Sequence, residues 1–214
     1  MGQMQKNLED MLTNAGWKTM PGKYNSLTIE DIKKHGFYDE VQNTYAKLGG
    51  IHDLFPIRFG GWDMEFDNVV IELDEQRHFN RYRLHTLGSD IYRQLNSFPQ
   101  QLYKEYCINH EEQCLKAGGF GGNWSNPSCE KYFGNASDLK DLSGNGSPRW
   151  KQRAFYDFLK DISIITNRIP LVRISIWDSL IIDGIPILVM DVLKKNDHRC
   201  VEGLKALIQQ RIPQ

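Results

Sequence analysis

The sequence predicts an α/β domain, because stretches with helical periodicity alternate with short apolar runs typical of strands. Residues 69–73 and 170–176 are the two strongest strand candidates, since both are rich in β-branched side chains. The helix predicted between them, from residue 150 onward, can return the chain so that the later strand lies beside the earlier one. These observations together favour a sheet flanked by helices.

Length and composition are consistent with a single domain and its core. The chain has 214 residues, of which 40% are hydrophobic and 25% charged, and its net charge is −1. This balance excludes a general polyanion binder, so nucleic-acid affinity would need a local basic patch. No apolar run approaches the roughly 18 residues that span a bilayer, and no signal-peptide core is visible. We therefore expect a cytoplasmic protein that does not contact a membrane.

The N-terminal part predicts helices followed by a change of period. A short helix is expected over residues 7–16, and a second one, capped by Ser26 or Thr28, continues to residue 48 with a break at Gly36. Alternating apolar residues then predict a strand from residue 56 through residue 66. The run 69–73 follows as a second strand, apolar enough to be central in its sheet.

The remaining elements divide into a loop-rich region and an ordered C-terminal part. A helix is predicted over 80–95 and another over 100–116, after which glycine becomes dense. A further helix is predicted from residue 150 onward, and its apolar stripe is typical of a helix packed on a core. After the strand 170–176 come an apolar run that fits strand or helix, and a final helix, at residues 185–193 and 199–211.

Three segments follow from this reading. Residues 1–50 form an N-terminal helical segment, residues 51–97 and 148–214 form the α/β core, and residues 98–147 form a Cys/Gly-rich insertion. The insertion has too little apolar periodicity to fold around a core of its own.

Acidic side chains lie on the predicted strand 56–66 and at the end of the predicted strand 69–73. Asp63 and Glu65 share one face of the first strand, and Glu72 and Asp74 share one face of the second. A turn at Asp67-Asn68 would bring Asp63 opposite the Glu72 end of its partner. Carboxylates gathered in this way repel one another unless a hard cation such as Mg²⁺ or Mn²⁺ lies among them.

A simpler interpretation remains open for these acids. Charged residues on strands are commonly an exposed polar face of an antiparallel sheet, and Arg77 and Arg81 would then be their salt-bridge partners. The spacing of Asp63, Glu72 and Asp74 alone does not decide between the two interpretations.

The stretch WDMEFDNVVIELDEQRHF resembles the core of the PD-(D/E)XK nuclease superfamily, and is closest to its very-short-patch-repair-like, restriction-endonuclease-like branch. Asp63, Glu72, Asp74 and His78 match the acids and the trailing histidine of that motif. The later stretch AFYDFLKDISIITNRIPLVRISIWD resembles the following helix and strand. The resemblance covers residues 55–95 and 150–178 and implies a restriction-endonuclease-like core, with a mixed central sheet flanked by helices.

The same resemblance implies roles for individual residues. Asp63, Glu72 and the Leu73 carbonyl would hold Mg²⁺ or Mn²⁺, with Asp74 as a further ligand or water-positioning group. No lysine lies two residues after Glu72, so Gln76 or His78 would take the role of the superfamily's lysine. A histidine suits proton transfer near neutral pH. Glu75 also departs from the pattern, because it occupies the usual glycine position.

Basic residues lie close to these acids in the sequence. Arg77 and Arg81 follow them directly, and Lys151 and Arg153 lie in the first turns of the predicted helix that follows the insertion. Such side chains make most phosphate contacts to DNA, so we expect these four to bind double-stranded DNA. The alternative for any single arginine is that it balances a neighbouring acid.

The insertion contains a candidate zinc site. Cys107, His110 and Cys114 fall on one helix face, and Cys129 could complete a tetrahedral Cys₃His site. The alternative is that the cysteines are buried free thiols and His110 is exposed. Cys200 lies in a separate segment and is expected to be a core thiol.

Three functions are compatible with these residues. The first is a metal-dependent endodeoxyribonuclease of restriction or repair type, which activates water with its metal ion and would need a homodimer to cut both strands. The second is a catalytically inactive nucleic-acid-binding protein on a nuclease-like fold. The third is a scaffold protein held together by zinc, with the acids solvated.

Overall fold

A small mixed sheet lies at the centre of the computed structural model, which describes residues 2–213. Its strand order is β1-β2-β3. Strand β1 (Met64–Glu65) pairs antiparallel with β2 (Val70–Asp74), and β2 pairs in parallel with β3 (Leu171–Ser175). In this register Glu72 lies opposite Arg173. The predicted strands 69–73 and 170–176 are thus confirmed to within a residue at each end.

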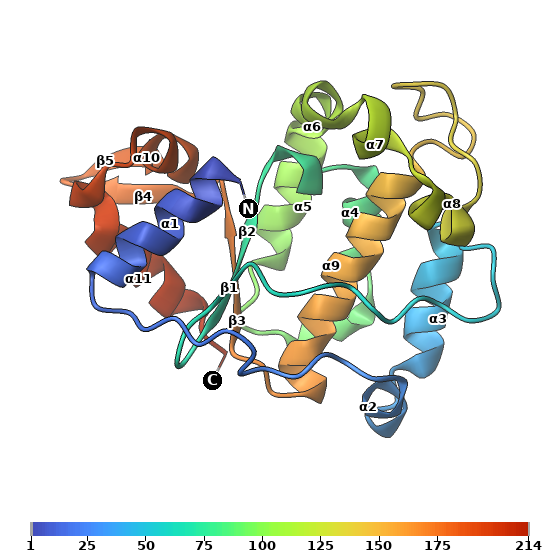
Figure 1. Ribbon diagram of the computed structural model, residues 1–214, viewed down its shortest axis with the longest axis horizontal. Coiled ribbons are helices and arrows are strands. Elements are labelled where there is room, and N and C mark those ends of the chain that lie inside the picture. The colour runs from blue at the N-terminus through green and yellow to red at the C-terminus, as the bar shows by residue number, and fades with distance from the viewer. Residues whose placement is uncertain (1, 214) are drawn as a thin grey trace.

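The two faces of the sheet differ in chemistry. Ile71 and Leu73 of β2 pack into an apolar cluster with Leu8 of α1 (Gln3–Asn14), Val192 of α10 (Val189–Lys195) and Leu204 of α11 (Val201–Arg211). The opposite face carries Glu72, Asp74 and Arg173; Glu72 and Arg173 contact α9 (Pro148–Thr166), and Asp74 pairs with Arg173. Figure 1 shows α1, α10 and α11 on one side of the sheet and α9 on the other.

Helix α9 forms because its N-cap, its apolar stripe and its C-cap are each typical of an α-helix. The Ser147 hydroxyl accepts a hydrogen bond from the Trp150 N–H, and Pro148 occupies the first turn, where it costs no hydrogen bond. The apolar stripe buries Phe155, Phe158 and their neighbours completely. Asn167 is the C-cap, as the sequence predicts.

Short helices surround α9 and form the larger of the two main apolar clusters with it. Trp124 and Phe133, from residues 98–147, are buried in the same cluster as Tyr45 and Phe155. This stretch therefore contributes to the main core, although its helices are too short to show a clear period. The helices of this layer are α2 (Ile29–Lys34), α3 (Tyr38–Lys47), α4 (Arg81–Thr86), α5 (Gln100–Asn109), α6 (Glu111–Gly118), α7 (Gly121–Trp124) and α8 (Pro127–Phe133), with 3₁₀ turns η1 (Gln76–His78) and η2 (Asp90–Gln94).

The long strand predicted over residues 56–66 is wrong. Only Met64–Glu65 forms a strand, and the residues before it cross α9 as an extended segment (Figure 1). Pro56 cannot donate a ladder hydrogen bond, and Gly60 has a φ of +81° that interrupts extended geometry. The alternating apolar residues instead pack on the helical layer, where Phe55 is buried.

Two predicted helices are also divided. The stretch 80–95 is interrupted between α4 and η2, and residues 100–116 form two helices that meet at His110. The break predicted at Gly36 is confirmed, because α2 ends before it and α3 begins after it.

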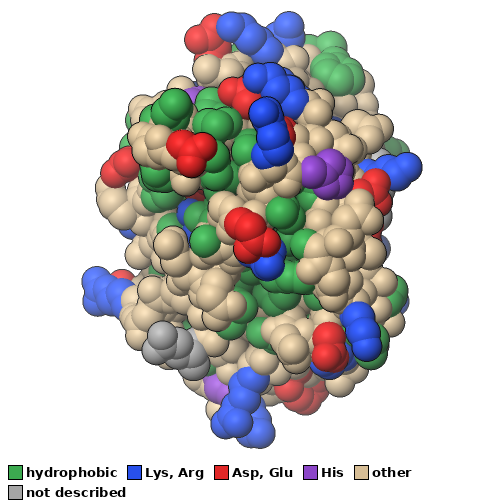
Figure 2. All heavy atoms as spheres, turned by 90° about the vertical axis from the view of Figure 1, so that its left-hand side faces the viewer, with side chains coloured by type: hydrophobic (Ala, Val, Ile, Leu, Met, Phe, Trp, Pro, Cys, Tyr) green, Lys and Arg blue, Asp and Glu red, His purple; other side chains and the backbone are tan. Residues whose placement is uncertain are grey.

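A two-stranded hairpin leads into the C-terminal helices. It consists of β4 (Ser179–Ile182) and β5 (Ile185–Leu188), so the apolar run 185–193 is a strand followed by α10. A 3₁₀ turn, η3 (His198–Cys200), precedes α11. Ile181 and Ile185 are 66% and 62% exposed. The side of the molecule that carries the hairpin shows apolar side chains among interspersed charges of both signs (Figure 2).

No helix within residues 2–213 combines the length and the apolar character needed to cross a membrane.

Candidate functional site

Asp63 and Glu72 lie side by side where β1 meets β2. The Asp63 N–H donates to Glu72 Oε1 at 3.0 Å, and the Leu73 N–H donates to Asp63 Oδ2 at 3.0 Å. The backbone pairing of β1 with β2 stops at Met64, and beyond it these two hydrogen bonds to side-chain carboxylates take the place of backbone hydrogen bonds. Both acids line one cavity of about 270 Å³. The two predicted acids are therefore brought together.

Lys160 of α9 holds Glu72 from the helix side. Its ammonium group donates to both carboxylate oxygens at 2.7 Å and to the Gly61 carbonyl at 3.0 Å. Burial raises the pKa of Glu72 to about 7, and the charge of Asp63 adds to this effect against the opposing charge of Lys160. Glu72 consequently changes its charge near neutral pH.

Asp74, His78 and Asp157 form a second group beside the first. His78 Nδ1 lies 2.8 Å from Asp157 Oδ2 and 3.1 Å from Asp74 Oδ1. Within residues 2–213 these are the only three His, Cys, Asp or Glu side chains whose ligand atoms all lie within 4.8 Å of one another. Asp74 Oδ2 is buried and, in this part of the chain, has no hydrogen-bond partner. The group has metal-ligand chemistry, although Asp63 and Glu72 are not part of it.

A buried ionic network fixes this second group in place. Arg173 of β3 donates to Asp74 at 2.7 Å and contacts Asp157 and Asp161 of α9. Burial alone would raise the pKa of Asp157, but the charges of His78 and Arg173 outweigh it and hold that pKa well below its usual range. Asp161 also accepts from Arg83 at 2.7 Å. On the charged face of the sheet, Glu72 is thus paired with Lys160 of α9, and Arg173 is paired with Asp74 beside it and with two acids of α9.

Two cavities meet at Asp63 and His78. The larger one also contains Phe59, Arg149, Arg153 and Tyr156. A smaller one of about 160 Å³ lies on the other side and is lined by Gly2, Gln5, Leu73, Glu75 and Arg77. The carboxylates at the end of β2 are therefore approached from two sides.

Other predicted site residues lie elsewhere. Gln76 turns away from both cavities, with its Nε2 3.9 Å from Met190 Sδ of α10. Arg81 forms a bidentate pair with Glu111, at 2.9 and 2.7 Å. Lys151 is buried and donates to Asn145. Of the four predicted DNA-contacting residues, only Arg77 and Arg153 line the cavities beside the carboxylates.

The four candidate zinc ligands do not come together. Within residues 2–213, no three of them have ligand atoms within 4.8 Å of one another. The Cys129 thiol donates to the Asn126 carbonyl at 3.0 Å, and the His110 ring stacks on Trp177 with centroids 3.9 Å apart. Burial raises the pKa of Cys107 and of Cys114 to about 12, so both remain protonated thiols. This geometry favours buried free thiols, which is also the state of Cys200.

Three important residues were not predicted as part of the site. Lys160 and Asp157 lie three positions apart on α9, and Arg173 lies within an apolar strand between Val172 and Ile174. A charged residue in an apolar run is a signal by itself, because burial of an unpaired charge is costly. Arg173 therefore indicated buried acids nearby, but the sequence does not reveal which ones.

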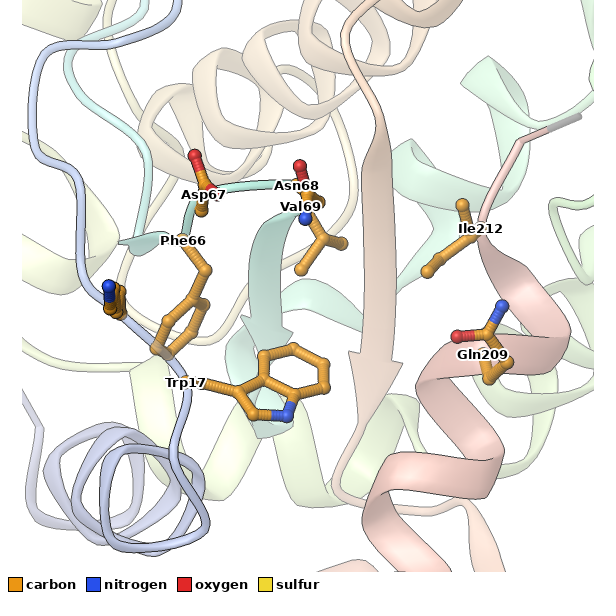
Figure 3. Close-up of a pocket in the computed structure, with 8 residues that line it drawn as sticks. Trp17, Phe66, Asp67, Asn68, Val69, Gln209 and Ile212 are labelled. Atoms are coloured by element: carbon orange, nitrogen blue, oxygen red, sulfur yellow. The ribbon is translucent and has the colours of Figure 1, made fainter.

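Another cavity, of about 240 Å³, lies at the opposite end of β2, next to the Asp67-Asn68 turn. Figure 3 shows Trp17 and Phe66 on one side of it and Gln209 and Ile212 on the other. It shares no lining residue with the two cavities at the carboxylates.

Comparison with known proteins gives one match. No curated protein and no solved structure matches the chain. Residues 43–195, which include the two carboxylates, His78 and the whole of α9, match a family of unknown function. Since the match spans more than half of the 214 residues, the chain belongs to this family of unknown function, DUF7255.

Proposed function

We propose that the protein is a metal-dependent endonuclease that hydrolyses phosphodiester bonds of double-stranded DNA, of restriction or repair type. The observation that carries the proposal is the pairing of Asp63 with Glu72, beside Lys160, in a cavity that two arginines also line. Acidic oxygens next to basic side chains suit a site that takes a cation together with a phosphate.

The order of the elements supports the proposal. A helix, an antiparallel pair of strands, a further helix and a strand parallel to the second one occur in the order α1, β1, β2, α9 and β3. The resemblance to PD-(D/E)XK nucleases implies an acid on each of two successive strands, followed by a helix and a further strand. Asp63, next to β1, and Glu72, on β2, match those acids here.

The donor atoms fit a hard divalent cation. Asp63 and Glu72 offer carboxylate oxygens. The N–H and C=O groups of one strand residue point to the same edge, and the Leu73 N–H donates to Asp63, so the Leu73 carbonyl also faces this edge of β2. Glu72 Oε1 accepts from both Lys160 and the Asp63 N–H, whereas Oε2 accepts from Lys160 alone and keeps a lone pair for a cation. These three residues would hold Mg²⁺ or Mn²⁺, which would supply positive charge to the phosphate and acidify a water molecule.

Lys160 provides the basic group that the sequence motif lacks. Asp74 stands two residues after Glu72, where the resemblance implies a lysine, but the Lys160 ammonium reaches the same carboxylate from α9. In the proposed reaction Lys160 holds Glu72 in position and places a positive charge next to the scissile phosphate.

His78 is the proposed proton-transfer group. Its Nδ1 is engaged by Asp157, so its Nε2 is the nitrogen left for a substrate or a water molecule. His78 lines both cavities at the carboxylates. Asp157 is then a positioning residue, which orients the ring.

Nicking of supercoiled plasmid in Mg²⁺ or Mn²⁺ tests this function. We expect Asp63→Asn and Glu72→Gln to lower the cleavage rate by at least about 100-fold, the magnitude typical when one electrostatic contact to a transition state is lost. Glu65→Gln is the matched control, because Glu65 lies two residues after Asp63, on β1, and lines neither cavity. Circular dichroism and thermal melting establish that each variant is folded. Full cleavage by both folded site variants would exclude the proposal.

A second candidate is a nucleic-acid-binding protein without catalytic activity. The contact of Lys160 with both oxygens of Glu72 favours it, because this lysine already neutralises one of the acids. Duplex binding in a gel-shift assay, with no cleavage in either metal ion over many sequences, would be its signature.

A further inference from the structure

The arginines of this protein fall into two groups. Within residues 2–213, six arginines form ion pairs with carboxylates and five form none; the paired ones are Arg81, Arg83, Arg93, Arg173, Arg199 and Arg211. Of the five without such a pair, Arg77, Arg149 and Arg153 line the cavities beside the carboxylates, and we call these three the arginine cluster. Their charge is not accounted for by the fold.

The arginine cluster lies next to the carboxylates. Arg149 and Arg153 are four residues apart on α9, so they share a helix face, and both line the cavity of about 270 Å³ that contains Asp63 and Glu72. Arg77 reaches the cluster from η1 and lines the adjoining cavity. Its guanidinium donates to Asn123 Oδ1 of α7 at 2.5 Å, which fixes its direction.

The three positive charges act on one another. Burial lowers the pKa of Arg153, and the charges of Arg77 and Arg149 lower it further. Asp157 is the carboxylate that acts in the opposite direction, but it is already engaged by His78 and Arg173. Half-buried like charges without a counter-ion destabilise the free protein, and a bound anion would offset that cost.

We propose that Arg77, Arg149 and Arg153 bind the terminal phosphate monoester of a nucleic-acid strand, next to the phosphodiester held at Asp63 and Glu72. This inference rests on the proposed function, because it names the substrate of the same site: a strand that ends in a phosphate, at a nick or a break. An internal phosphodiester carries one negative charge, whereas a terminal monoester carries nearly two at neutral pH. Three guanidinium groups match the monoester better.

The rest of the cavity wall fits a terminal nucleotide. Phe59 and Tyr156 line it together with Arg149 and Arg153. Aromatic rings stack on unpaired bases without strong sequence preference. A strand end held in this way would place its phosphate on the arginine cluster and a neighbouring phosphodiester over the carboxylates.

Binding measured without a divalent metal separates this inference from catalysis. Fluorescence anisotropy in EDTA compares four labelled DNAs of one sequence: a nicked duplex with a 5′-phosphate, one with a 3′-phosphate, one with hydroxyls only, and an intact duplex. We expect one of the phosphorylated nicks to bind at least about tenfold more tightly than the hydroxyl nick, since charge-assisted hydrogen bonds contribute this much. Equal affinity for all four DNAs would overturn the inference.

Matched variants show which residues are responsible. Arg149→Gln and Arg77→Gln should each remove most of the preference for the phosphorylated nick, while Arg199→Gln, which lies in η3 and pairs with Asp197, should keep it. Inorganic phosphate should also raise the melting temperature of the wild type, at constant ionic strength, and not that of Arg149→Gln. An unchanged preference in both site variants would refute the arginine cluster as the site. Plasmid cleavage that survives this result would leave the proposed function intact.

Discussion

Glu72 is a carboxyl group held in two competing environments. It is only 2% exposed, and its neighbours include both an acid and a lysine. Burial favours the protonated form and Lys160 favours the ionised one, and the balance places its pKa at about 7. The charge of the candidate site therefore depends on pH in the range where most proteins are assayed.

This balance makes protein stability depend on pH. The pKa of Glu72 rises from its usual 4.5 to about 7 on folding, so between these values the folded state binds more protons than the unfolded state. Stability contributed by Glu72 is thus fully present below pH 4.5 and decreases as pH rises to about 7. Urea denaturation in EDTA at several pH values should show that Glu72→Gln lacks this decrease. Parallel pH profiles for wild type and variant would contradict the expectation, and Glu65→Gln is the control.

At the scale of elements, α9 connects the charged face of the sheet to the cavity. Its first turns carry Arg149 and Arg153 on one side. Further along the helix, the side chains that pair with the strands are Asp157, Lys160 and Asp161. The apolar stripe of the same helix is packed in the larger core. A single helix therefore positions both the basic and the acidic partners of the sheet.

Asp161 is the acid on which this packing depends most. It is fully buried and accepts from Arg83, Tyr92 and Arg173. Asp161→Asn would leave two buried guanidinium groups without their common counter-ion, and we expect a loss of about 3–5 kcal/mol in the free energy of unfolding. Urea denaturation measures it. Asp90→Asn, which breaks the exposed pair with Arg93, should change stability far less, and equal losses would contradict this account.

Element patterns explain which parts of the fold could be predicted. The strands β2 and β3 and the helix α9 have strong local periods, and all three were predicted close to their bounds. Strand β1 could not be delimited, because a side-chain contact of Asp63 ends its ladder. The pairing of Asp63 with Glu72 followed from strand geometry. The contribution of Lys160 did not, because it depends on how α9 lies on the sheet.

At the scale of the whole molecule, the sheet separates two apolar cores. One contains α9 and the surrounding short helices, and the other contains α1 with α10 and α11. Figure 1 shows the N-terminal helix beside the C-terminal ones, far from it in sequence. Such pairing of distant segments has no local signal, so the sequence predicts one N-terminal helical segment over residues 1–50, in which α1 belongs with the helices that follow it.

The smaller core should depend on α1. Leu8 is fully buried there, so Leu8→Ala should lower the free energy of unfolding by about 2–5 kcal/mol, the cost of a cavity in a packed core. Lys6→Ala, on the exposed side of the same helix, is the control. If α1 were only a peripheral appendage, denaturant midpoints of the two variants would coincide.

The hydrogen bond from the Leu73 amide to Asp63 has a further consequence for dynamics. The Leu73 amide proton is shielded by the Asp63 side chain and not by the backbone of a neighbouring strand. Its exchange with deuterated solvent is therefore governed by how long the Asp63 carboxylate stays in place. A cation that recruits the Asp63 oxygens would alter this lifetime directly. The Leu73 amide is thus a native spectroscopic probe of occupancy at the end of β2.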